Sequence, residues 1–214
     1  MNYPLLALDA APGTGSAALL LPDGSSLAAE SEDDRAHSRT LVPMLEALLS
    51  RAGLDWSDLR MLALGIGPGS FTGLRIAAAT FAGINASLAL PTLPVSSLAI
   101  TAAQAQSDAE LWVLEDARAG EVFVGRFQGC RAVTNDRCIS WEVLQQEKPA
   151  SYVSVSTPPL PLPGWQRLER SLARTAALTR VVQQVLRDAG ADDDLPGYVQ
   201  PAYLQISQAE KNLQ

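Results

Sequence analysis

The sequence predicts an α/β fold built from two similar halves. Apolar segments of strand length alternate with segments of helical periodicity along the chain. In addition, the segment LLALDAAPGTGSAALLLPDG, which begins at Leu5, is echoed in pattern by LWVLEDARAGEVFVGRFQG, which begins at Leu111. Each is an apolar strand that ends in an aspartate, followed by a short turn and a second strand. Asp9 and Asp116 therefore lie half a chain apart, which favours a duplication.

The elements of the first half follow from local patterns. A third strand, a helix, a buried strand and a second helix are expected at 26–32, 37–53, 61–66 and 72–90. The first helix has leucines at helical spacing and Gly53 as its stop signal. Pro43 is tolerated if this helix begins near Thr40, because amides of the first turn have no helical partner.

The second half is less regular. Strands are expected at 110–118, 121–127, 130–139 and 151–155, and a helix at 171–190. The segment TPPLPLPGW is too rich in proline for a regular element. An acidic linker, ADDDLPG, leads into the C-terminal tail.

Composition excludes several classes of protein. The 214 residues are 47% apolar, enough for a core, and carry a net charge of −7, which argues against binding nucleic acid without a basic partner. No apolar run reaches the ~18 residues of a membrane span, and the N-terminus does not resemble a signal peptide. Cys130 and Cys138 are too few for a disulfide framework, so we expect reduced thiols.

The glycine-rich stretch GIGPGSFTGLRI, residues 65–76, joins an expected strand to an expected helix, as many phosphate-binding loops do. No Gly-Lys-Ser/Thr follows, so it is not a Walker A motif, and the glycine spacing departs from the dinucleotide-binding fingerprint. Ser70 or Thr72 can cap the helix. Gly73 is expected to keep the helix start close to its strand. A tight turn without a ligand and an anion site both stay open.

The helix after this loop carries small residues in two rows. Residues four apart along it are Ala79, Gly83 and Ser87 in one row and Ala78, Ala82 and Ala86 in the next. Side chains this small remove little area from water but let another helix approach closely. We therefore expect close helix packing, either inside the fold or across a subunit interface.

The string GPGSFTGLRI, preceded by HSRTLVPMLEALL and followed by DARAGEVF, resembles the bacterial tRNA threonylcarbamoyladenosine biosynthesis proteins of the TsaB (YeaZ) family. The resemblance covers most of residues 5–127, plus PAYLQ near the end. It implies the actin-like fold of two ribonuclease-H-like halves, with mixed sheets flanked by helices. On that basis we assign residues 1–97 and the tail 198–214 to the N-terminal half, and residues 98–197 to a shortened second half.

The resemblance also implies a non-catalytic subunit. The family's catalytic relative, TsaD, transfers a threonylcarbamoyl group to adenosine 37 of tRNAs that read codons beginning with A. TsaB pairs with TsaD, and an ATPase subunit, TsaE, joins them. The implied partners are TsaD, TsaE and, for the chain alone, a second copy, with tRNA bound only through the complex in the cytoplasm. No cofactor or metal is implied on the isolated chain, and the place considered for ATP or ADP is the interface with TsaD.

Three positions depart from the family's pattern. Ala10 stands where a threonine often follows the first-strand aspartate, Ala77 replaces a glycine, and Gln205 replaces the arginine of YLR. Ala10 removes a hydroxyl from the place where actin-like enzymes hold phosphate. Gln205 puts a charged contact by the tail in doubt.

The alternative is an enzyme, either an actin-like ATPase or kinase or a metal-independent peptidase. His37 is the chain's one histidine, which is a poor basis for a transition-metal site. A serine hydrolase of the nucleophile-elbow type would need a G-x-S-x-G motif, which is absent. Phosphoryl transfer would use Asp9 and Asp116 with Mg²⁺, but we interpret both as turn-forming aspartates at strand ends.

Two residues of the loop favour an assembly surface. Phe71 at the tip of a turn suits a core pocket or a partner better than a phosphate. Arg75 lies near the positive end of its helix and is expected to meet a carboxylate or a phosphate. The residues predicted for the interface are His37, Leu41, Leu45, Phe71, Arg75, Ala78, Ala82, Gly83 and Ala86. The residues considered for a vestigial nucleotide site are Asp9, Gly67, Gly69, Ser70 and Asp116.

Overall fold

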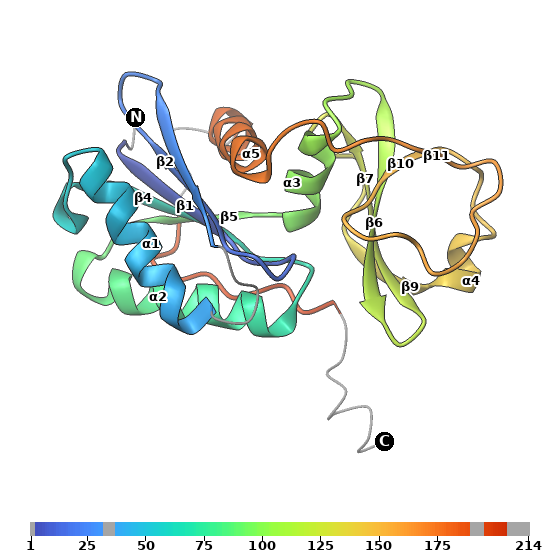
Figure 1. Cartoon of the computed structure of the whole chain (residues 1–214), viewed down its shortest axis with the longest axis horizontal. Helices are drawn as coiled ribbons and strands as arrows, with labels where there is room; N and C mark the ends of the chain where they lie inside the picture. Colours follow the sequence, from blue (N-terminus) through green and yellow to red (C-terminus); the bar gives the residue numbers. More distant parts are fainter. Residues whose placement is uncertain (1–2, 32–36, 189–194, 205–214) are drawn as a thin grey trace, which may run out of the picture.

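Two mixed β-sheets, one from each half of the chain, form the framework of the computed structural model, which describes residues 3–31, 37–188 and 195–204 (Figure 1). The elements of the first half are β1 (Leu5–Asp9), β2 (Ser16–Leu20), β3 (Ser26–Glu30), α1 (His37–Arg51), a 3-10 turn (Trp56–Asp58), β4 (Met61–Gly65), α2 (Phe71–Leu88), β5 (Thr92–Val95) and α3 (Ser97–Gln104). Those of the second half are β6 (Glu110–Arg118), β7 (Glu121–Gln128), β8 (Arg131–Ala132), β9 (Arg137–Ser140), α4 (Trp141–Leu144), β10 (Ser151–Val153), β11 (Gln166–Arg167) and α5 (Arg174–Asp188).

The two sheets share one topology, which confirms the internal echo in the sequence. The first has the order β3-β2-β1-β4-β5, and β1 runs antiparallel to β2 and parallel to β4. The second has the order β8-β7-β6-β10-β11, and β9 also pairs with β7. There β6 runs antiparallel to β7 and parallel to β10. This arrangement of two similar α/β halves agrees with the actin-like fold that the resemblance implies.

Helices cover the first sheet on both faces (Figure 1). Leu6 and Leu8 of β1 pack in a cluster with the leucines of α1 and with alanines and Phe81 of α2, whereas Leu5 and Ala7 pack in a cluster with α3 and α5. This alternation follows from the two-residue period of a strand that is buried on both faces. The second cluster also takes in apolar residues of β6, β7 and β10, so one continuous core joins the two sheets through α3 and α5.

The second half has less helix than the first. The four-residue α4 stands between β9 and β10, and the segment between β10 and β11 contains no helix. As expected, the proline-rich stretch there is irregular, and its Leu160, Leu162 and Trp165 pack over a cluster that contains Trp112 and Trp141. This loop covers the outer face of the second sheet in place of a helix.

Three expectations about elements need correction. The first helix begins at His37, not near Thr40, so Pro43 lies inside α1. The expected strand 130–139 is split into β8 and β9, and between them Asp136 turns to accept a hydrogen bond from the Ser96 hydroxyl at 2.7 Å. The short helices α3 and α4 were not expected, because their apolar runs are brief and lack a distinctive helical period.

The tail returns to the first sheet. Pro196 accepts a hydrogen bond from the Thr92 amide at 2.8 Å, and Gly197 accepts one from the Asn85 side chain at 2.6 Å. Residues 191–194 of the expected acidic linker and Gln205 lie outside the described residues. Within the described ranges, no helix is long and apolar enough to cross a membrane.

Candidate functional site

The glycine loop between β4 and α2 packs closely against the turn between β1 and β2. Gly67 has a φ of 98°, a left-handed conformation that favours glycine. A Cβ at Gly69 would stand 2.6 Å from the carbonyl oxygen of Ala11, and a Cβ at Gly73 would overlap the carbonyl oxygen of Ala10. The expectation for Gly73 therefore needs correction. The absence of a side chain there makes room for the main chain of the β1–β2 turn, not for the strand that precedes α2.

Several main-chain amides at the start of α2 already have partners. The Ser70 amide donates to the carbonyl of Ala11 at 2.7 Å, the Gly73 amide to the Ser70 hydroxyl at 3.3 Å, and the Leu74 amide to the Ser70 carbonyl at 2.9 Å. Ser70 rather than Thr72 is therefore the cap. An anion at this helix end would compete with these bonds, so the contacts favour a tight turn over a phosphate site.

Asp9, at the end of β1, is fully buried and paired with Arg174 at the start of α5. The guanidinium donates to Oδ2 from Nη2 at 2.7 Å and from Nε at 2.9 Å. The Ser97 hydroxyl donates to Oδ1 at 2.6 Å. The interpretation of Asp9 as a turn-forming residue is therefore wrong, because its carboxylate is a buried ion-pair partner.

The polar network continues toward the second sheet. Arg174 donates from Nη1 to the Thr101 hydroxyl of α3 at 3.0 Å, and this hydroxyl lies 3.0 Å from Oε1 of Glu115 on β6. Burial raises the pKa of Glu115 to about 7, although the nearby Arg174 charge and the Thr101 hydrogen bond act to lower it. The network therefore links β1, α3, α5 and β6 across the two halves.

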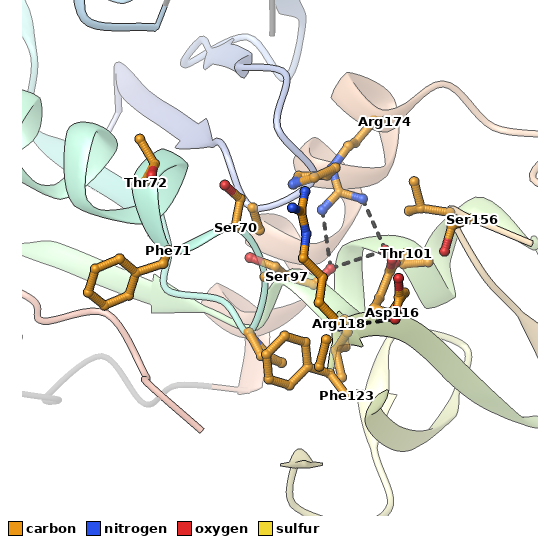
Figure 2. A pocket seen from close by; sticks show the side chains of 18 residues that line it. Ser70, Phe71, Thr72, Ser97, Thr101, Asp116, Arg118, Phe123, Ser156 and Arg174 are labelled. Carbon is orange, nitrogen blue, oxygen red and sulfur yellow. Dashed lines mark hydrogen bonds between the residues drawn. The ribbon is translucent and has the colours of Figure 1, made fainter. Parts of the chain in front are cut away.

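A cavity of about 530 Å³ opens above this network, between the two halves. Its walls come from the β1–β2 turn, the start of α2, the end of β6 and the Arg174 side chain. Asp116 and Arg118 line it, and the Asp116 carboxylate accepts a hydrogen bond from the Arg118 amide at 3.0 Å. Figure 2 shows Phe71 pointing away from Ser97 and Arg174.

A magnesium-bound nucleotide does not fit these residues. Asp9 is fully buried and both of its carboxylate oxygens accept hydrogen bonds from inside the chain, so the carboxylate presents no exposed oxygen to Mg²⁺ or to its bound water. Asp116 is exposed and caps its own turn. Among the described residues, no three His, Cys, Asp or Glu side chains are grouped as a metal site.

The structure divides the residues predicted for the interface. Phe71, Arg75, Gly83 and Ala86 are exposed on α2 and Ala82 is half-buried. Leu41, Leu45 and Ala78 are buried, because the apolar sides of α1 and α2 cover their own sheet. These three cannot reach a partner and are withdrawn from the interface. His37 begins α1, and its side chain lies outside the described part of the structure.

Arg75 has aromatic neighbours. Its guanidinium carbon lies 3.8 Å from the centroid of the Phe71 ring and 5.8 Å from that of Tyr203 in the tail, and the two rings are 5.1 Å apart. Within the described ranges, no ion pair involves Arg75, so no carboxylate of the chain itself meets it there, and a carboxylate on another subunit stays a prediction. A cation over an aromatic face is an alternative form of stabilisation.

Sequence reasoning missed Arg174, Thr101, Glu115 and Tyr203. One signal could have identified Arg174. It stands at the first position of α5, where a cation opposes the helix dipole unless an anion meets it. The same argument was applied to Arg75, but nothing local indicated that Asp9 would be the partner of Arg174.

Comparisons with known proteins identify relatives of this chain. A family model described as "TsaD: tRNA N6-adenosine threonylcarbamoyltransferase" matches residues 31–153, more than half of the chain. The chain is 37% identical over 128 residues to the tRNA threonylcarbamoyladenosine biosynthesis protein TsaB of Haemophilus influenzae, and 36% identical over 127 residues to that of Escherichia coli. These alignments cover 57% and 58% of this chain and 52% and 54% of the relatives, so the chain spans about half the length of the curated relatives it matches.

Two solved structures from Pseudomonas aeruginosa are similar over nearly the whole chain. A protein described as similar to peptidase YEAZ aligns with a TM-score of 0.76 and 27% identity, covering 94% of this chain and 99% of that one. YeaZ aligns with a TM-score of 0.70 and 28% identity, covering 91% and 99%. The chain therefore belongs to the family described by the TsaD model, as a member of the TsaB (YeaZ) type with an actin-like fold.

Proposed function

We propose that this chain is a non-catalytic subunit that supports N6-threonylcarbamoylation of adenosine 37 in tRNAs reading codons that begin with A. It would do so by pairing with a TsaD-type transferase subunit. The curated relatives are named for threonylcarbamoyladenosine biosynthesis, which supports the pathway. The proposed role of the chain in this pathway, pairing with the transferase subunit, rests on the exposed side of α2.

The exposed side of α2 carries the proposal. Phe71, Arg75, Ala79 and Gly83 lie four residues apart and are all exposed, so they form one stripe along the helix. We call these four residues the α2 stripe. Two of the four side chains are large and two are minimal, so a partner helix can approach closely beside Ala79 and Gly83 and be anchored at Phe71. Tyr203 extends the stripe by packing on Phe71.

The state of the cleft supports a non-catalytic role. A phosphoryl-transfer enzyme of this fold needs carboxylates that are free to hold a metal ion. In this chain the buried carboxylate of Asp9 forms an ion pair with Arg174. We therefore expect the purified chain to show no ATPase, kinase or peptidase activity above background. ATP turnover that disappears in Asp9→Asn would favour the actin-like ATPase alternative.

The remaining partners follow from the same proposal. An ATPase subunit of the TsaE type joins the pair, and the chain alone forms a homodimer through the α2 stripe. With a net charge of −7, it meets tRNA only through its partners. Any ATP or ADP in the assembly binds at the interface with the transferase. The complex works in the cytoplasm.

Gly83→Arg tests the proposed surface directly. A Cβ at Gly83 would meet nothing within 4 Å, so arginine there disturbs nothing inside the chain. We expect the variant to keep its circular dichroism spectrum and to lose most of its binding to the TsaD-type subunit from the same cell, measured by light scattering after gel filtration. Ala176→Arg, on the exposed side of α5, is the matched control and should bind normally. Equal binding by both variants would place the interface elsewhere.

A further inference from the structure

The strongest polar feature outside the α2 stripe is the ion pair at the floor of the cleft. Arg174 is 8% exposed and Asp9 is not exposed at all. The guanidinium makes four contacts, two with Oδ2 of Asp9, one with the Thr101 hydroxyl and one with the Ser97 carbonyl at 3.3 Å. A buried charge with this many partners is fixed in position.

The Asp9–Arg174 ion pair lies directly below the cavity. Asp9 ends β1 at the point where the chain turns below the cavity, and Gly65 on the neighbouring strand has no Cβ because one there would overlap the Asp9 carboxylate. The carboxylate is therefore enclosed by its own sheet on one side and by Arg174 and Ser97 on the other. A second cation close to it would be repelled by the guanidinium in a poorly screened site.

We propose that Arg174 is the permanent cation of this cleft: it neutralises Asp9 in the place of a metal ion and so keeps a metal–nucleotide complex out. This inference deepens the non-catalytic part of the proposed function, which rests on the same ion pair, and it does not depend on docking at the outer side of α2. One consequence is that a nucleotide found with an assembly of this chain is held by a partner or at its interface, not on the cleft floor.

The same cation also ties the two halves together. Through the Thr101 hydroxyl, Arg174 connects Asp9 of the first sheet to Glu115 of the second. The charged groups that act on Glu115 are Arg174, Arg170 and Asp9. The apolar core is also continuous through α3 and α5. The core and the ion pair together hold the two halves in contact without a ligand.

The test compares Arg174→Met, Asp9→Asn and the double variant with the wild-type chain. Removing one partner leaves a buried unpaired group, so the midpoint of thermal unfolding should fall by roughly 10 °C in Arg174→Met. The double variant, which removes both charges of the ion pair, should regain most of that loss. Arg131→Met is the matched control. It breaks an exposed ion pair with Asp188 and should shift the midpoint by no more than about 2 °C.

Magnesium with ADP is then added to the wild-type chain and to Asp9→Asn. We expect no rise in the wild-type midpoint and no heat of binding by calorimetry. The inference is overturned if the wild-type midpoint rises and the rise is lost in Asp9→Asn. It is also overturned if Arg174→Met is as stable as the wild type, or if the double variant is no more stable than Arg174→Met. None of these readouts depends on tRNA modification, so failure here is distinct from failure of the docking proposal.

Discussion

Two glycines of the same helix are predicted to respond to alanine in opposite directions. At Gly73 a Cβ would overlap the carbonyl oxygen of Ala10, which is main chain and cannot move without shifting the β1–β2 turn. Overpacking of this kind costs about 1–3 kcal/mol. At Gly83 a Cβ would meet nothing within 4 Å, so Gly83→Ala should gain about 0.5–1 kcal/mol of helix propensity. The two variants should therefore differ by about 1.5–4 kcal/mol in free energy of unfolding.

Urea unfolding followed by circular dichroism measures both free energies. The dependence of the unfolding free energy on urea should be the same in both variants and the wild type, because the folded surface hardly changes. If Gly73→Ala proves as stable as Gly83→Ala, then α2 does not approach the β1–β2 turn as described. The explanation given for the glycine loop would then fail as well.

Three further predictions follow from single contacts. Burial raises the pKa of Glu115 from 4.5 to about 7, so the folded chain holds this proton more tightly than the unfolded chain and the free energy of unfolding should decrease between pH 5 and 7. In Glu115→Gln this decrease should be smaller by about 1–3 kcal/mol in urea titrations at each pH, and an unchanged pH profile would contradict the assignment. Asn85→Ala removes the hydrogen bond to Gly197 and should cost about 1–3 kcal/mol while exposing the tail to proteases; a tail as resistant as in the wild type would count against this. Phe71→Ala and Arg75→Ala should each weaken binding of the TsaD-type subunit in calorimetry without changing the response to ATP, and loss of ATP binding in Arg75→Ala would instead indicate a phosphate site.

Much of the fold could be predicted from the sequence because its signals are local. The apolar runs of β1 and β4, the 3.6-residue period of α1 and α5, and the repeated strand-Asp-turn-strand pattern are each contained within about 20 residues. The repeat also predicted that the halves share a topology, which strand order and direction confirm. The eight-residue α3 was missed because its apolar run fits a buried strand equally well.

The candidate site was only partly predictable because its contacts are distant in sequence. Asp9 and Arg174 are 165 positions apart, and neither neighbourhood identifies the other. A leucine-rich helix face also looks the same whether it covers its own sheet or a partner, which is why Leu41 and Leu45 were wrongly placed at an interface. Phe71, Arg75 and Gly83, which were predicted for the same interface, are exposed, and their role in an interface stays a prediction.

The central claim is that this chain assists a transferase without performing chemistry itself. The most direct measurement is reconstitution of tRNA threonylcarbamoylation from purified subunits, with modified adenosine quantified by mass spectrometry of digested tRNA. We predict modification when the TsaD-type and TsaE-type subunits are joined by the wild-type chain or by Ala176→Arg, and little when the chain is left out or replaced by Gly83→Arg. Equal modification with and without the chain would contradict the account.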